Sequence, residues 1–270
     1  MRVVSLLFHD VYASDPRESG FRSPGADRYK LTVPAFEAQL DGLAAVDVET
    51  PWLAHDLLRS SELPSPEPGC GIPAAITFDD GGESYYTVAA DRLEALDWRG
   101  HCFVTTDFIG QRGFLTPAQL RELDARGHLI GSHSATHPAR FNSLTLVEMR
   151  AEWSDSRQKL EDVLGHAVTV ASVPGGYFSD NVARAAADAG LRVLFTSEPT
   201  TRIVEAHDLL LIGRFTIRRG HPPDAARRFV VATPWARCGA WVGWNAKALV
   251  KPVLGASYAR IADWILEPNR

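Results

Sequence analysis

ITFDDGG, residues 76–82, places two adjacent carboxylates and two glycines directly after an apolar run. Acidic side chains are almost never fully buried unless they are paired or bind a cation. Asp79 and Asp80 therefore indicate a functional site at the end of a buried strand. In parallel α/β folds, ligands bind at the carboxyl ends of the strands. Two adjacent acids also repel each other unless a cation or a proton lies between them.

Short apolar runs alternate with helical segments along most of the chain, which predicts an α/β fold with a largely parallel sheet, open or closed into a barrel. The segments predicted as strands are 3–8, 74–78, 101–105, 129–132, 168–173, 191–196 and 209–212. The segments predicted as helices are 34–46, 84–96, 116–126, 145–164 and 180–189. The helix over 145–164 has the strongest signal, because Thr145 and Glu148 form a capping box and Gly165 follows its end. Residues 11–30 are polar and are predicted as a long loop, a kind of segment that is often functional.

The chain of 270 residues is interpreted as one domain, residues 1–270, with a C-terminal extension over 234–270. A turn-rich stretch at 64–71 resembles a linker, but no core-sized segment precedes it. The extension is basic, is predicted to be helical, and contains Trp235, Trp241, Trp244 and Trp264. It is either a helical cap that packs its tryptophans on the barrel or a face that contacts a membrane or a lipid-linked substrate.

The composition narrows the class of protein. A formal net charge of -5 without a long basic run argues against nucleic-acid binding, which needs Lys and Arg to neutralise phosphates. Three widely spaced cysteines, Cys70, Cys102 and Cys238, suggest neither a disulfide framework nor a Cys-type zinc site. The first ten residues lack a signal-peptide pattern, and no apolar run reaches about 18 residues. We therefore expect a cytoplasmic protein, with peripheral membrane contact through 234–270 as the alternative, and the oligomeric state stays open.

A second predicted strand end, GSHSATHP at residues 131–138, places His133 and His137 four residues apart. Neutral imidazole is the commonest metal-ligating side chain, and this spacing lies within the range of protein metal ligands. Pro138 argues against a continuing helix, so a loop site is predicted. A single histidine is usually structural, whereas two at one strand end favour a ligand pair.

Two further strand ends carry polar or glycine-rich segments. SVPGGYFS, residues 172–179, contains two glycines that would let backbone amides approach a ligand and stabilise an oxyanion, although an ordinary turn is the simpler interpretation. LLFHD, residues 6–10, ends in His9 and Asp10. Adjacent strand residues point to opposite faces, so Asp10 need not be the partner of His9, and a surface histidine remains an alternative.

Three of these motifs together resemble the polysaccharide deacetylases of carbohydrate esterase family 4, also called NodB-homology proteins. They are TFDDG at 77–81, HSxxHP at 133–138 and PGG at 174–176, and the resemblance covers about residues 74–196. It implies a distorted (β/α) barrel of about seven parallel strands that holds one divalent metal ion. Zn²⁺ is the expected ion, with Co²⁺ and Ni²⁺ as alternatives.

The resemblance also implies roles for individual residues. Asp80, His133 and His137 would be the metal ligands, and Asp79 would be the general base. The turn formed by Gly175, Gly176 and Tyr177 would contact the oxyanion or the substrate.

The general acid is assigned through a subset of the family. The usual late Leu-x-His motif is not recognisable in this sequence. Some members are circularly permuted and begin with a strand that ends in His-Asp, which LLFHD resembles, and SGF at 19–21 with ADRY at 26–29 also resembles such members. This makes His9 the predicted general acid, with Asp10 as its support.

Two departures from the family leave the substrate open. Ser172 stands where the third motif normally has an arginine that holds the catalytic aspartate, and Arg214 is the candidate substitute. The fourth motif is not recognisable. The predicted function is removal of an N-acetyl group from an amino sugar in a polysaccharide precursor, a lipid-linked sugar or a glycosylated metabolite. The alternatives are a deformylase, a cyclic amide or imide hydrolase, and a catalytically decayed carbohydrate-binding module.

Overall fold

The computed structural model describes residues 2–46, 51–59, 73–231 and 234–254. The linker predicted at 64–71, Cys70 and Trp264 lie outside the described residues. Of the cysteines that the structure describes, Cys102 is buried and Cys238 is exposed, and both are free thiols.

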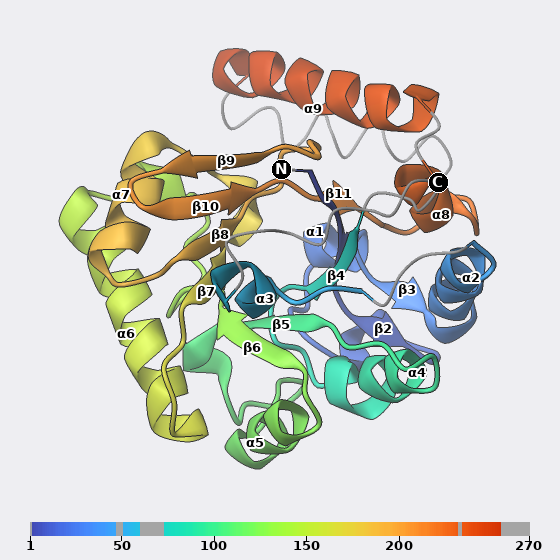
Figure 1. Cartoon of the computed structure of the whole chain (residues 1–270), viewed down its shortest axis with the longest axis horizontal. Coiled ribbons are helices and arrows are strands. Elements are labelled where there is room, and N and C mark those ends of the chain that lie inside the picture. Colours follow the sequence, from blue (N-terminus) through green and yellow to red (C-terminus); the bar gives the residue numbers. More distant parts are fainter. Residues whose placement is uncertain (1, 47–50, 60–72, 232–233, 255–270) are drawn as a thin grey trace.

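A curled sheet of nine strands forms the centre of the described part (Figure 1). In spatial order the strands are β11 (Phe215–Thr216), β1 (Val4–Phe8), β4 (Ala74–Phe78), β5 (His101–Val104), β6 (Leu129–Ser132), β7 (Val170–Ser172), β8 (Val193–Phe195), β10 (Leu209–Ile212) and β9 (Ile203–Ala206). Neighbouring strands are parallel except β9, which is antiparallel to β10. The predicted parallel-rich (β/α) barrel is confirmed, with eight parallel strands where about seven were expected.

Two backbone contacts bring the edges of the curled sheet together. The Val3 N–H donates to the carbonyl of Thr201 at 2.8 Å, and Arg2 forms an isolated antiparallel bridge with Arg202. The segment just before β9 thereby reaches the start of β1. A separate two-stranded sheet, β2 (Val11–Tyr12) with β3 (Leu31–Thr32), flanks the barrel.

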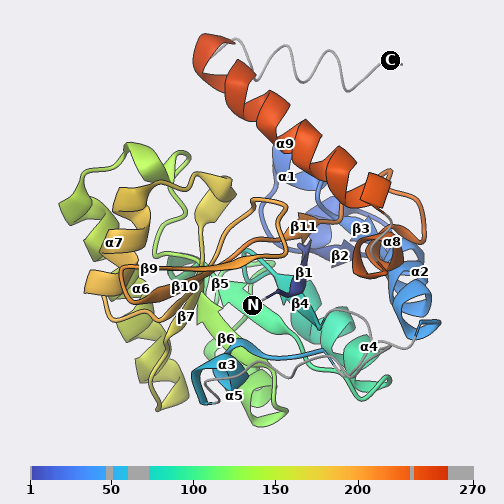
Figure 2. The same ribbon diagram turned by 45° about the horizontal axis from the view of Figure 1, so that its top comes forward.

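Helices surround the sheet. They are α2 (Val33–Ala44), α4 (Ala90–Glu94), α5 (Pro117–Ala125), α6 (Leu146–Leu164), α7 (Asp180–Asp188), α8 (Ala225–Val230) and α9 (Pro234–Leu254), with the short α1 (Pro24–Asp27) in the early loop. Figures 1 and 2 show α2, α4, α5, α6 and α7 following one another around the sheet, with α8 beside α2 and α9 between α7 and α8. The strong signal for α6 is confirmed, because the Thr145 side chain accepts from the Glu148 N–H and Gly165 adopts φ 80° at the end.

Two local features differ from the sequence-based expectation. The helix predicted over 84–96 begins with a π-helical stretch, Tyr85–Ala89, before α4. Strand β9 was not predicted, because its residues are half-buried or exposed and have no clear alternation. His207 and Asp208 turn the chain between β9 and β10 with positive φ at both positions, the backbone that tight hairpins prefer.

The short helix α3 (Ala54–Arg59) closes the amino end of the barrel. The Ala54 N–H donates to Nε2 of His101 at 2.9 Å, and Nδ1 of that ring lies 3.0 Å from the Ile76 carbonyl. Burial lowers the pKa of His101 to about 3, so the ring is neutral and serves as a buried hydrogen-bonding link. Aromatic rings of Phe103 and Phe195 fill the interior above it. The opposite, carboxyl end of the barrel is left for the site.

Helix α9 has an inner and an outer face. Ala236 and Ala240 pack on the core, and Arg237 donates to the carbonyls of Phe229 and Val230 at the end of α8. Trp235 is 86% exposed on the outer side. No helix within the described ranges is both long and apolar enough to traverse a bilayer. Contact of the exposed face with a lipid surface therefore stays a prediction.

We predict that Gly131→Ala destabilises the barrel, because a Cβ on Gly131 would lie 2.7 Å from the Phe103 ring and 2.7 Å from the Val170 carbonyl. Overpacking of this kind costs about 1–3 kcal/mol. Urea unfolding measures the loss. Gly25→Ala is the matched control, since its Cβ would meet only Ser23 Oγ at 3.8 Å; equal stability of the two variants would contradict this packing.

Candidate metal centre

Parallel pairing brings the polar strand ends to one side of the barrel. Strand β1 lies beside β4, and β5 separates β4 from β6. Asp79 and Asp80 follow β4, His133 follows β6, and His9 follows β1. The Asp79 N–H donates to the Phe8 carbonyl at 3.2 Å, which joins the first two strand ends directly.

Asp80, His133 and His137 form a cluster with the geometry of a metal site. One ligand atom from each lies within 4.8 Å of the others. Oδ1 of Asp80 is 3.5 Å from Nε2 of His133 and 3.7 Å from Nε2 of His137. Asp80 and His133 are buried and His137 is half-buried. These predicted ligands are therefore brought together.

Ser172 sets the orientation of His133. The Nδ1 atom of His133 lies 2.6 Å from Ser172 Oγ and 3.1 Å from the Ser172 carbonyl. Ser172 Oγ donates its own hydrogen to Asp79, so it accepts from Nδ1 of His133, and this leaves Nε2 unprotonated and facing Asp80, as a metal-ligating imidazole requires. The three donors therefore fit a divalent cation, and two imidazoles with one carboxylate suit zinc.

The electrostatics of the cluster favour an ionised Asp80 carboxylate and a neutral His137 ring. Burial acts to raise the pKa of Asp80, but the surrounding His133, His9 and His137 outweigh it and lower that pKa. Burial and the neighbouring His133 lower the pKa of His137, which keeps the ring neutral. Ligands in these protonation states are the ones that bind a cation.

Three non-glycine residues of the site have left-handed backbone: Asp80 at φ 78°, Ser134 at φ 65° and His137 at φ 56°. Such conformations each cost about 1–3 kcal/mol and persist only where the surroundings impose them. Glu152 of α6 supplies part of that constraint. Its carboxylate accepts from the Ala135 and Thr136 N–H groups at 3.0 and 2.9 Å and from the Thr136 hydroxyl.

Asp79 is held by a buried arginine. Arg214, between β10 and β11, donates from two nitrogens to the two Asp79 oxygens at 2.7 and 2.8 Å, and Ser172 Oγ donates to Oδ1 at 2.9 Å. Arg214 is fully buried. Burial acts to raise the pKa of Asp79, but Arg214 followed by His133 outweighs it and holds that pKa well below its usual value. Arg214 therefore supplies the support proposed for it, and Ser172 bonds both Asp79 and His133.

His9 lies within electrostatic range of the same cluster. Burial lowers the pKa of His9, while Asp80 and then Asp79 act to raise it. The expectation that Asp10 supports His9 is wrong. Asp10 points to the other side, where its Oδ1 accepts from Ser19 and Ser84 hydroxyls, and its Oδ2 has no partner among the described residues.

The turn after β7 leaves one backbone donor for a ligand. The Gly176 N–H donates to Val173 and the Tyr177 N–H to Pro174, each at 3.3 Å. Within the described part of the chain, the Gly175 N–H has no such acceptor. Gly176 has φ 68°, and a side chain there would meet Ser197 at 2.9 Å and the Trp244 ring at 3.2 Å. Helix α9 thus reaches the edge of the candidate site through Trp244.

Residues 68–194 match the family model described as polysaccharide deacetylase. These residues belong to the polysaccharide deacetylase family. The Bacillus subtilis protein YxkH, whose name assigns it to the polysaccharide deacetylases, is 29% identical over 150 residues, which cover 56% of this chain and 52% of YxkH. The chain thus spans about half the length of that curated relative.

Two solved structures share the fold. The Streptococcus pyogenes deacetylase PplD, in complex with acetate, has a TM-score of 0.68 at 21% identity, over 85% of this chain and 98% of PplD. A de-N-acetylase from Aggregatibacter actinomycetemcomitans has a TM-score of 0.69 at 16% identity, over 85% of this chain and 100% of that one. The family match includes Asp79, Asp80, His133 and His137 but neither His9 nor Arg214. The permuted motif order therefore stays a prediction.

We predict that Arg214→Met destabilises the protein by about 3–5 kcal/mol, because it leaves the Asp79 carboxylate buried without its cationic partner. The double variant Asp79→Asn with Arg214→Met should recover much of the loss. Denaturant unfolding measures both. Arg92→Met is the control, since Arg92 pairs with Glu37 on the surface and such pairs contribute about 0–1 kcal/mol. If the losses of stability of the two single variants simply added up in the double variant, the coupling between Asp79 and Arg214 would be contradicted.

We predict that Glu152→Ala weakens metal binding by about 10–100-fold while the fold is kept, because the histidine loop loses the acceptor for two of its N–H groups. Competition with a chromogenic zinc chelator measures the affinity. Glu148→Ala is the control on the same helix, since Glu148 bonds only the Thr145 cap. Unchanged affinity in Glu152→Ala would show that the loop holds its shape without this carboxylate.

Proposed function

We propose that the chain is a metal-dependent hydrolase that removes an N-acetyl group from an amino sugar. The observation that carries the proposal is the convergence of Asp80, His133 and His137 into one donor cluster. Beside it lies Asp79, and both of its carboxylate oxygens accept hydrogen bonds from Arg214. Membership of residues 68–194 in the polysaccharide deacetylase family supports the substrate class.

Asp80, His133 and His137 would hold one divalent cation, Zn²⁺ first and Co²⁺ or Ni²⁺ as alternatives. When bound, such an ion lowers the pKa of a water molecule from about 15.7 towards 7 and polarises a carbonyl. The remaining steps are assigned to side chains and backbone groups of the chain.

Asp79 is the proposed general base. It takes the proton of the attacking water, and the water oxygen forms a bond to the acyl carbon. Arg214 and Ser172 hold the carboxylate in one orientation, so no reorganisation is needed at that moment. Arg214 also weakens Asp79 as a base by lowering its pKa, which makes the acidity of the water essential.

His9 is the proposed general acid, and Gly175 the oxyanion contact. The Gly175 N–H donates to the carbonyl oxygen as its negative charge develops. The carbon–nitrogen bond then breaks, and protonated His9 gives its proton to the leaving amine. Acetate and a free amino sugar result. A positioned acid and base each contribute about 10²–10⁴-fold to the rate.

The names of the relatives support an N-acetyl substrate. One solved neighbour is a de-N-acetylase, and another is a deacetylase in complex with acetate. A polysaccharide precursor, a lipid-linked sugar and a glycosylated metabolite all fit this chemistry. Deformylation and cyclic imide opening are the nearest rival reactions. The intact set of Asp79, Asp80, His133 and His137 argues against a decayed binding module.

We predict acetate release from N-acetylglucosamine oligomers by the zinc-loaded protein, with formamides and cyclic imides as the rival substrates in the same assay. Asp79→Asn should keep stoichiometric metal and lose turnover by about 10²-fold or more. His133→Ala should lose the metal, as measured by mass spectrometry. Turnover of imides alone, or normal deacetylation by Asp79→Asn, would refute the substrate class or the base assignment respectively.

A further inference from the structure

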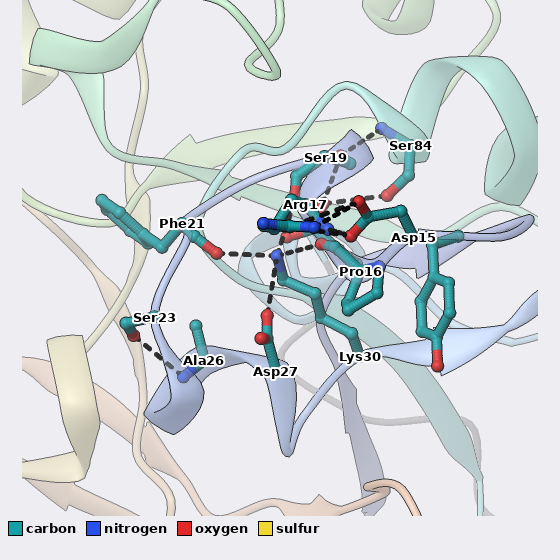
Figure 3. Close-up of polar contacts among 12 residues, drawn as sticks. Asp15, Pro16, Arg17, Ser19, Phe21, Ser23, Ala26, Asp27, Lys30 and Ser84 are labelled. Atoms are coloured by element: carbon teal, nitrogen blue, oxygen red, sulfur yellow. Dashed lines mark hydrogen bonds and ion pairs between the residues drawn. The ribbon is translucent and has the colours of Figure 1, made fainter.

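The loop between β2 and β3 is fastened from inside by a buried lysine, Lys30, which is 1% exposed. Its Nζ donates to the carbonyls of Pro16, Ser19 and Phe21 at 2.6, 2.7 and 2.6 Å, which uses all three hydrogens of an ammonium group. Asp27 lies 3.6 Å away. Figure 3 shows these groups converging on the Lys30 nitrogen. The loop is therefore built around a single buried cation.

Asp10 fastens the same loop to the barrel. Its Oδ1 accepts from Ser19 Oγ at 2.6 Å and from Ser84 Oγ at 2.9 Å, and the Ser84 N–H donates to Ser19 Oγ at 2.8 Å. A Cβ on Gly20 or Gly82 would overlap the carboxylate, so both glycines are required for its close approach. The loop is thus fixed both within itself and against the start of the helix after β4.

The fastened loop presents two aromatic rings to the candidate centre. Phe21 lies 5.0 Å from the His137 ring, between centroids, and also contacts Phe108 and Phe114. Tyr29, the residue before Lys30, lies 4.8 Å from the His9 ring at an interplanar angle of 33°. One loop therefore contacts both a predicted metal ligand and the predicted general acid.

The His9 ring lacks the support that a catalytic imidazole usually has. Its Nδ1 is buried and has no hydrogen-bond partner among the described residues. The adjacent carboxylate, Asp10, is engaged by Ser19 and Ser84. An imidazole that no hydrogen bond orients is free to rotate about its ring bond unless packing prevents it. The Tyr29 ring is the packing partner that the structure provides.

We propose that Tyr29 is the positioning residue of His9, by packing its ring against the imidazole in place of a carboxylate hydrogen bond, and that Lys30 holds Tyr29 in place. The proposal rests on the acid role given to His9 above. A general acid must lie within hydrogen-bond reach of the leaving nitrogen, and a displacement of about 1 Å can cost about 10²-fold in rate. Since the contact is between the two rings, the Tyr29 hydroxyl is not needed.

The kinetic test compares Tyr29→Phe, Tyr29→Ala and Lys30→Met in the zinc-loaded protein. Tyr29→Phe should keep kcat within about twofold of the parent. Tyr29→Ala should lower kcat by about 10–100-fold with KM changed by less than about threefold and metal content unchanged. Lys30→Met, where it folds, should reproduce that kcat loss. Tyr86→Ala is the control, because Tyr86 bonds Glu122 away from the centre.

Three results would overturn the proposal. A higher KM with normal kcat in Tyr29→Ala would mean that the ring binds substrate instead of orienting His9. A lower kcat in Tyr29→Phe would mean that the Tyr29 hydroxyl, and not its ring, positions His9. The third readout needs no turnover: the His9 ring-proton resonance, assigned by its absence in His9→Gln, should move in Tyr29→Ala and stay in Tyr29→Phe. An unmoved resonance refutes the packing of Tyr29 on His9, whereas an inactive parent with the expected resonance shifts refutes only the proposed function.

Discussion

The buried pair of Arg214 and Asp79 is the interaction on which the centre depends. Both groups are almost fully buried, and a lone charge at such a depth would be strongly destabilising. The pair is stable because its geometry is bidentate and because Thr196, Thr77 and Ser172 satisfy the remaining hydrogen-bonding groups. Ser172 also bonds His133, so the carboxylate and the first imidazole are parts of one hydrogen-bonded unit. His133 is also a member of the donor cluster, so this unit positions one of the three predicted ligands.

A second constraint is the left-handed backbone at Asp80, Ser134 and His137. These conformations turn the chain sharply after β4 and β6, so that side chains from two strand ends face a common point. The strain is held by packing around Gly81 on one side and by the Glu152 carboxylate on the other. The strained backbone thus lowers the stability of the fold but positions the predicted ligands, as is common at functional sites.

The sequence was informative where chemically reactive residues directly follow an apolar run that forms a strand. Asp79, Asp80, His133 and His137 follow apolar runs, and parallel pairing alone predicts that they meet. The partner of Asp79 could only be suggested, because Ser172 and Arg214 are 42 residues apart and no local pattern joins them. The role of Asp10 was predicted wrongly because the sequence shows that it neighbours His9 but not that Ser19 and Ser84 engage its carboxylate. Glu152 and Lys30 gave no signal, since a charged residue that bonds backbone groups looks like any surface residue.

The distance along the chain between Asp79 and Arg214 has a consequence for biosynthesis. The two residues are separated by 135 positions. A domain generally folds as a unit, and contacts between residues far apart in the sequence are slow to form. Until the chain has been synthesised through β10 and Arg214, the Asp79 carboxylate has no guanidinium to neutralise it. Nascent chains that stop short of Arg214 would have to keep the carboxyl end of β4 hydrated, so this end of the barrel closes only after β10 has been made.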